Sequence, residues 1–98
     1  MTLTSSQNRY LRGLAQQTRA VVLLGTKGAT AAVVKELDLA LEHHELVKVK
    51  LSGGDKAERL TQVAALTAGT RAEAVHQLGH TVLLFRRNVD APKIALPR

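Results

Sequence analysis

The 98-residue sequence contains no cysteine, only two aromatic residues (Tyr10 and Phe85), and no apolar stretch long enough to span a membrane. The lack of cysteine excludes a disulfide framework, a thiolate metal site and a cysteine nucleophile. It also fits the cytoplasm, where we expect this protein to work. Two aromatic side chains cannot form a platform on which several bases stack, as an RRM does. The polar residues 1–5 do not have the pattern of a signal peptide.

Acidic residues are scarce relative to basic ones. Fourteen Lys and Arg against eight Asp and Glu give a formal net charge of +6. A small basic protein attracts polyanions and binds them with a strong dependence on salt. A chain of this length forms one domain with an ordinary hydrophobic core. The composition therefore favours a nucleic acid as partner, although a basic surface also serves solubility alone.

Residue patterns typical of enzymes and metal sites are missing. The sequence has neither the Gly-Lys-Ser/Thr of a P-loop nor the Gly-x-Gly-x-x-Gly of dinucleotide sites. His43 and His44 are adjacent on a predicted helix and point apart, while His76 and His80 flank a predicted turn, so they form no convincing ligand set. No pair of nucleophile and base is visible. We expect no enzymatic activity, no metal, no cofactor and no small-molecule substrate.

Periodic apolar positions predict seven elements in the order α-β-α-β-α-β-β. Helices are expected at about residues 4–16, 30–44 and 55–68, and strands at about 20–24, 46–51, 72–78 and 81–87. Because two helices connect successive strands, we expect right-handed β-α-β units and a mainly parallel sheet with one antiparallel strand. The predicted fold class is α/β, a two-layer domain with a four-stranded mixed sheet. Residues 88–98 lack periodicity and form a predicted tail.

Short polar signals mark the ends of these elements. Thr4 with Gln7, and Asp55 with Glu58, have the spacing of capping boxes at helix starts. Gly69 is placed to end the third helix in the left-handed conformation. The dipeptide 79–80, which begins with glycine, is typical of a type II′ hairpin between the last two strands.

The most informative motif is Gly25-Thr26-Lys27-Gly28, which follows an apolar run and precedes the second predicted helix. A strand that turns through Gly-x-x-Gly into a helix exposes backbone N–H groups and the positive end of the helix dipole. Glycine lets a nucleic-acid backbone approach closely, and Lys27 adds a full positive charge. KH domains clamp nucleotides with a loop of this kind. The alternative is a tight turn without a ligand.

Basic side chains on two predicted strands extend this positive surface. Apolar residues alternate with Lys48 and Lys50, so this strand has a core face and a basic face. Arg86 and Arg87 are adjacent and point to opposite faces of the last strand. If the apolar residues two and four positions before Arg86 face the helices, Arg86 shares their direction. The sequence does not decide which arginine meets RNA, and a solvated strand face is the alternative for Lys48 and Lys50.

The first predicted helix and the tail carry further cations. Arg9 and Arg12 lie three positions apart and so on nearly the same side of the helix, where solubility is an equally good explanation. Lys93 and Arg98 offer non-specific phosphate contacts from an end of the chain that we expect to be mobile.

Several of these segments together resemble a known family. They resemble the CRM domain in its stand-alone bacterial form, the YhbY-like proteins, over roughly residues 3–87. The matching pieces are Leu3-Thr4, Gln7, Leu11-Arg12, the run 21–28 with Thr30, Glu36-Leu37, Ala40-Leu41, the run 44–49 (His-Glu-Leu-Val-Lys-Val), Gly79 and the run 81–86. The specific signal is the Gly-x-x-Gly loop followed at this distance by His-Glu-Leu-Val-Lys-Val.

The resemblance implies a CRM-type RNA-binding domain at residues 1–87 and a C-terminal tail at 88–98. It implies a fold similar to the C-terminal domain of a bacterial translation initiation factor. It also implies RNA binding through the glycine loop, with Thr30 among the matched positions, and association with precursors of the large ribosomal subunit. The function we predict is binding of large-subunit rRNA by a monomer that assists ribosome assembly.

Two other functions remain open from the sequence. The first alternative is a protein–protein adaptor that docks on a ribosomal protein or an assembly factor. A duplex-DNA binder comes third, because no recognition helix of a known DNA-binding type is visible. The sequence identifies neither the RNA element nor the assembly step.

Overall fold

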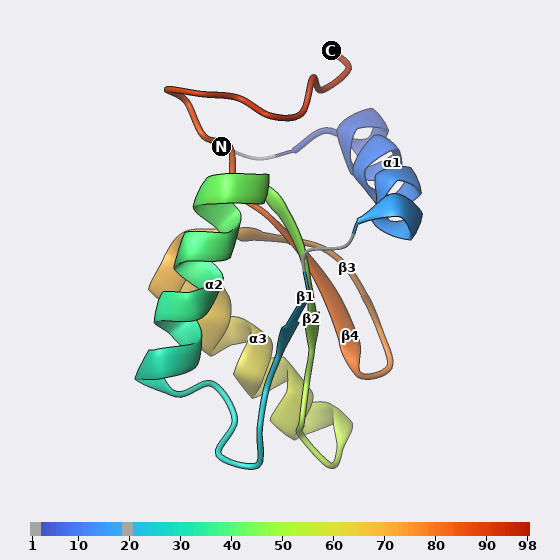
Figure 1. Cartoon of the computed structure of the whole chain (residues 1–98). Coiled ribbons are helices and arrows are strands. Elements are labelled where there is room, and N and C mark those ends of the chain that lie inside the picture. Colours follow the sequence, from blue (N-terminus) through green and yellow to red (C-terminus); the bar gives the residue numbers. More distant parts are fainter. Residues whose placement is uncertain (1–2, 19–20) are drawn as a thin grey trace.

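The computed structural model describes residues 3–18 and 21–98, and its elements follow the predicted order (Figure 1). The helices are α1 (Ser5–Leu14), α2 (Ala31–His44) and α3 (Lys56–Thr70), and the short 3-10 helix η1 (Ala15–Gln17) follows α1. The strands are β1 (Val21–Leu23), β2 (Leu46–Lys50), β3 (Glu73–Leu78) and β4 (Thr81–Phe85). Ala20, which the prediction placed in the first strand, lies outside the described residues.

The four strands form one mixed sheet in the order β1-β2-β4-β3. β1 and β2 are parallel, and β4 is antiparallel to both β2 and β3, so three strands run in one direction, as predicted. Gly79 has a φ of 58° and His80 is not among the residues with positive φ, as the predicted type II′ turn requires. The position of β4 between β2 and β3 was not indicated by the sequence. One consequence is that β1, β2 and β3 all end at the same edge of the sheet.

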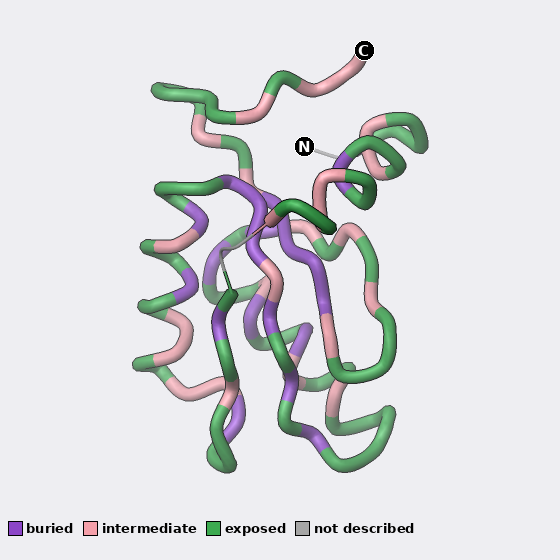
Figure 2. The backbone as a smooth tube through the Cα atoms, turned by 45° about the vertical axis from the view of Figure 1, so that its right-hand side comes forward, coloured by how far each residue is buried: buried purple, intermediate pink, exposed green. Residues whose placement is uncertain are grey.

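The helices lie on both faces of the sheet (Figures 1 and 2). α2 and α3 cover one face, and their cluster of buried residues includes Val22, Leu37, Leu41, Val47, Val49, Leu66, Val82 and Leu84. α1 covers only one end of the other face, over a smaller cluster formed by Leu3, Leu11, Leu46, Leu83 and Phe85. We call the part of the second face that α1 does not cover the open face.

The predicted capping residues start their helices. The Thr4 hydroxyl accepts from Gln7 N at 3.1 Å, and Gln7 Oε1 accepts from Thr4 N at 3.0 Å, which completes the capping box. Asp55 Oδ1 accepts from Glu58 N at 2.8 Å. The Glu58 carboxylate, however, accepts from Gly54 N at 3.2 Å. The second box therefore closes one residue earlier than predicted and still satisfies two backbone donors.

Gly69 does not end the third helix, and that prediction was wrong. α3 continues to Thr70, and Arg71 takes the left-handed conformation with a φ of 64°. A Cβ at position 69 would lie 2.7 Å from Cγ1 of Val34 on α2. Glycine is needed here because the two helices approach closely, not because the backbone requires positive φ. The prediction had assumed the commonest use of a glycine near a helix end.

A β-bulge in β3 changes which residues reach the open face. Ala74 pairs with Leu84, but His76 pairs with Leu83, so the register shifts between them. Residues two apart in a regular strand share a face, and without the bulge His76 would face α2 and α3 together with Ala74. The bulge turns His76 onto the open face.

Residues 88–98 form no helix or strand and lie beside α1 (Figure 1). Ile94 and Leu96 pack against the cluster under α1. The buried carboxylate of Glu45 accepts hydrogen bonds from the backbone N–H groups of Asn88 at 2.7 Å, Lys93 at 2.6 Å and Ile94 at 2.7 Å. These contacts hold the tail in place, whereas the sequence had led us to expect a mobile end. The division of the chain at residue 87 stays a prediction.

Candidate nucleic-acid interface

The Gly-x-x-Gly loop lies at the edge of the sheet where β1 ends, directly before α2 (Figure 1). Gly28 N donates to Gly25 O at 3.0 Å and closes the turn. Gly28 is buried and has a φ of 73°, which residues with a Cβ rarely adopt. Gly25, Thr26 and Lys27 are exposed. The loop therefore presents its backbone and one positive charge to solvent.

Thr30 links this loop to the start of α2. Its hydroxyl accepts from Val33 N at 3.2 Å, and its own N–H donates to Gly28 O at 3.0 Å. The N-terminus of α2 is thus fixed behind the loop, where the helix dipole favours an anion. The structure gives Thr30 a capping role, and its contact with RNA stays a prediction.

A second glycine loop, residues 51–55, lies at the same edge of the sheet because β1 and β2 are parallel. Gln62 on α3 holds this loop: its Oε1 accepts from Ser52 N at 3.1 Å and from Gly53 N at 3.0 Å. Its Nε2 donates to Ser52 Oγ at 3.0 Å and lies 3.1 Å from where a Cβ of Gly28 would be. Gln62 therefore holds the second loop and lies against the first at Gly28. The sequence analysis missed it, since a glutamine within a helix carries no local signal of such a role.

Two basic residues in the first turn of α3 add positive charge at this edge. Lys56 is exposed, and Arg59 is partly buried. Arg59 Nη1 donates to Gly53 O at 3.3 Å and lies 3.4 Å from Nε2 of His80 in the β3–β4 turn. The two loops and this turn therefore lie together. The sequence analysis missed Lys56 and Arg59. They could have been found from their position at the start of a helix that follows a strand parallel to β1, because both strands then end at the same edge.

Lys48 and Lys50 point to the open face, as the alternation in β2 predicted, while the alternating residues Val47 and Val49 are buried. Arg12 of α1 joins them around a groove of about 460 Å³ on this face. Arg9 is exposed on α1 but does not line the groove. The structure thus brings three of the predicted basic residues together and leaves Arg9 apart.

Two findings concern other kinds of site. Within residues 3–18 and 21–98, no three side chains of His, Asp or Glu are grouped so that they could hold a metal ion. In the same residues, no helix has the length and apolar character needed to cross a membrane.

Comparison with known proteins identifies the family of this chain. A family model of the CRS1/YhbY (CRM) domain matches residues 3–86. The chain belongs to this family. The Haemophilus influenzae protein named "RNA-binding protein" is 41% identical over 97 residues, which cover 99% of this chain and 97% of that protein. "Probable RNA-binding protein YqeI" of Bacillus subtilis is 30% identical over 95 residues, which cover 97% of this chain and 99% of that protein.

A solved structure supports the same assignment. The solution structure of the hypothetical protein SAV1595 from Staphylococcus aureus matches with a TM-score of 0.81 and 30% sequence identity, over 98% of this chain and all of that one. The family resemblance and the α/β fold class predicted from the sequence are therefore confirmed. The names of the two sequence relatives describe RNA-binding proteins, not enzymes.

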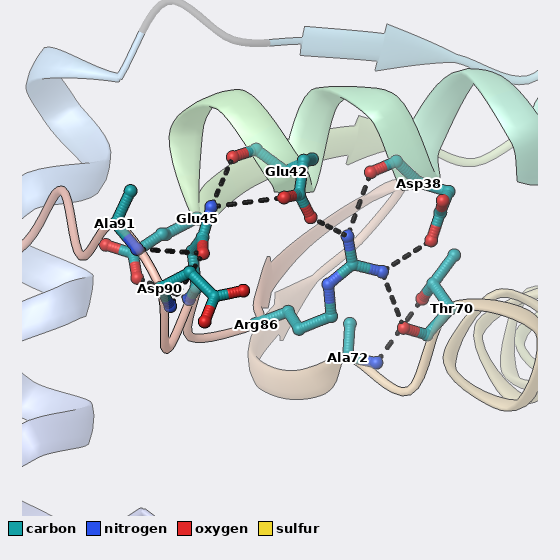
Figure 3. Close-up of polar contacts among 9 residues, drawn as sticks. Asp38, Glu42, Glu45, Thr70, Ala72, Arg86, Asp90 and Ala91 are labelled. Carbon is teal, nitrogen blue, oxygen red and sulfur yellow. Dashed lines mark hydrogen bonds and ion pairs between the residues drawn. The ribbon is translucent and has the colours of Figure 1, made fainter.

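In this CRM domain, Arg86 takes part in polar contacts with residues of α2 and the end of α3 (Figure 3). It follows β4 at the edge of the sheet opposite the glycine loops and points toward α2. Its guanidinium donates to the Asp38 carboxylate, to the backbone oxygens of Asp38 at 3.0 Å and Thr70 at 2.9 Å, and to the Glu42 carboxylate at 3.4 Å. Arg86 thus connects α2, the end of α3 and β4. The structure gives it a stabilising role and does not place it with the predicted RNA contacts.

Proposed function

We propose that this CRM domain binds RNA through its Gly-x-x-Gly loop and the adjacent basic surface. The observation that carries the proposal is the exposed loop at the N-terminus of α2, with Lys27 at its tip and Lys56 and Arg59 of α3 at the same edge. Helix N-termini and nearby cations suit the phosphates of a nucleic acid. The names of the relatives support the same class of ligand.

We further propose that the RNA is large-subunit rRNA or its precursor, and that the protein assists ribosome assembly as a cytoplasmic monomer without a cofactor. The RNA part of this proposal is supported by two relatives named as RNA-binding proteins, of which the match covers 97% and 99%. The scarcity of aromatic side chains favours structured RNA, recognised by phosphate and shape contacts, over free single strands. If about four to six phosphates are neutralised, log K should fall with log salt at a slope of roughly −3 to −5.

The test is binding to a transcript of large-subunit rRNA by a variant with Thr26→Asp and Lys27→Asp. Both loop glycines remain, so the fold should survive while the loop repels phosphate. The matched control is Val89→Asp with Lys93→Asp, which makes the same charge change at exposed positions at the opposite edge of the sheet. We expect the loop variant to lose binding and salt dependence with an unchanged melting temperature. The control should keep most of both.

Equal loss in both variants would mean that net charge, not the loop, determines binding. Unchanged binding by the loop variant would remove the loop from the interface and leave it as a turn. Salt-insensitive binding to a ribosomal protein or an assembly factor, with none to rRNA, would favour the adaptor function instead.

A further inference from the structure

The groove on the open face is a hollow that is lined in part by exposed apolar side chains. Its lining includes Val21 of β1, Leu78 of β3 and Leu83 of β4, and Ala15 of the short helix η1 borders it. Val21 and Leu78 are 45% and 74% exposed although both are large and apolar. A set of such side chains on a solvent-facing surface is typical of a binding site. The groove has about 460 Å³, within the usual range for a site that takes a small ligand or a single nucleotide.

The charge around this groove is positive. Arg12, Lys48 and Lys50 line it, and within the described part of the chain none of its lining residues is acidic. Lys50 is also the last residue of β2, and its backbone oxygen accepts from Leu24 N, the residue before the glycine loop, at 2.9 Å. The positive side of the groove is therefore continuous with the proposed phosphate-binding edge. A ligand that is both anionic and apolar fits this combination.

The bulge in β3 adds a flat ring to the groove. His76 lines it only because the register shift turns that residue away from α2 and α3. Histidine is one of the side chains on which unpaired RNA bases stack. An acidic peptide would also match the charges, but it would make no particular use of an imidazole beside an aliphatic floor. A nucleotide would use all three features of the groove: its base would contact the aliphatic floor and the imidazole ring, and its phosphates would contact the positive charges.

We propose that this groove holds one unpaired nucleotide of the bound RNA. The base packs on Leu78 and Leu83 and against the ring of His76, while its flanking phosphates lie near Lys48 and Lys50. This inference rests on the proposed RNA-binding function and adds to it a preference for structured RNA that carries an unpaired base. The proposal needs no rearrangement of the protein, since the groove is formed in the structure.

The experiment compares two synthetic RNA hairpins with the same stem. One stem is fully paired, and the other contains a single unpaired 2-aminopurine nucleotide. Wild-type protein should bind the second hairpin at least about fivefold more tightly, the lower end of the effect of stacking one base on a ring. The 2-aminopurine fluorescence should change on binding. The His76→Ala variant should lose the preference and the fluorescence change, and His76→Phe should keep both.

The loop variant Thr26→Asp with Lys27→Asp provides the second arm. It should weaken binding of both hairpins by the same factor and leave their ratio unchanged. Binding of neither hairpin by the wild type would refute the proposed function itself. Equal binding of both, or an unchanged preference in a folded His76→Ala variant, would overturn the nucleotide site alone and leave the groove to a protein partner.

Discussion

Replacing Glu45 by glutamine should destabilise the fold because this carboxylate holds the tail from inside the protein. Glu45 is fully buried, and one of its oxygens accepts from the N–H groups of Lys93 and Ile94 while the other accepts from Asn88 N. An amide keeps one acceptor oxygen but turns an NH₂ group toward the third N–H. The variant therefore loses one hydrogen bond to a charged group and weakens the other two. This should lower the free energy of unfolding by about 2–3 kcal/mol.

In a domain of this size that loss corresponds to a fall in melting temperature of about 10–20 °C. The measurement is thermal unfolding followed by circular dichroism, together with hydrogen exchange at the amides of Lys93 and Ile94, which should lose protection. Glu36→Gln is the matched control, since it removes the same charge from an exposed position on α2. A Glu45→Gln protein that melts within about 2 °C of wild type, with both amides still protected, would refute this reasoning.

Alanine substitutions at three glycines give further predictions. Gly69→Ala should lower stability by about 1 kcal/mol despite the better helix propensity of alanine, because its Cβ would lie 2.7 Å from Cγ1 of Val34. In a Val34→Ala background, where the clash is removed, urea unfolding should show that Gly69→Ala is stabilising. If Gly69→Ala alone stabilised the protein, the close packing of the two helices would be contradicted. Gly28→Ala should cost about 1–2 kcal/mol because φ is 73° at that position. Gly25→Ala should leave stability within about 0.5 kcal/mol, since no atom lies within 4 Å of its Cβ. It should nevertheless weaken rRNA binding if the RNA backbone approaches there, and unchanged affinity would argue against that approach.

Local signals in the sequence correctly predicted the element order and several contacts. The capping box at Thr4 and Gln7 forms because both partners lie within one helical turn. The alternation around Lys48 and Lys50 placed them on one face because the pleat of a strand depends only on its own residues. The turn at the glycine loop was predictable in the same way, because strand, turn and helix are consecutive there, while its contact with RNA stays a prediction.

Predictions failed or stayed incomplete where distant segments decide the outcome. Gly69 looked like a helix terminator, but its role depends on Val34 of another helix. The direction of Arg86 was predictable from alternation, whereas its acceptors are Asp38 and Glu42, more than 40 positions earlier in the sequence. Gln62 belongs to the same group, because it supports a loop ten residues before it and lies against another at Gly28.

By itself the sequence determined the family, the order of helices and strands, the glycine loop and the basic character of the protein. These depend on short-range periodicity, on the conformational range of glycine and on residue types, all of which are present in the chain before it folds. Only the tertiary structure decided that the loop joins Lys56 and Arg59 at one edge of the sheet, that Glu45 holds the tail, and that a bulge brings His76 to the groove. The reason is physical: strand order, register and burial are set by contacts between segments far apart in the sequence, and no local pattern encodes which segments meet.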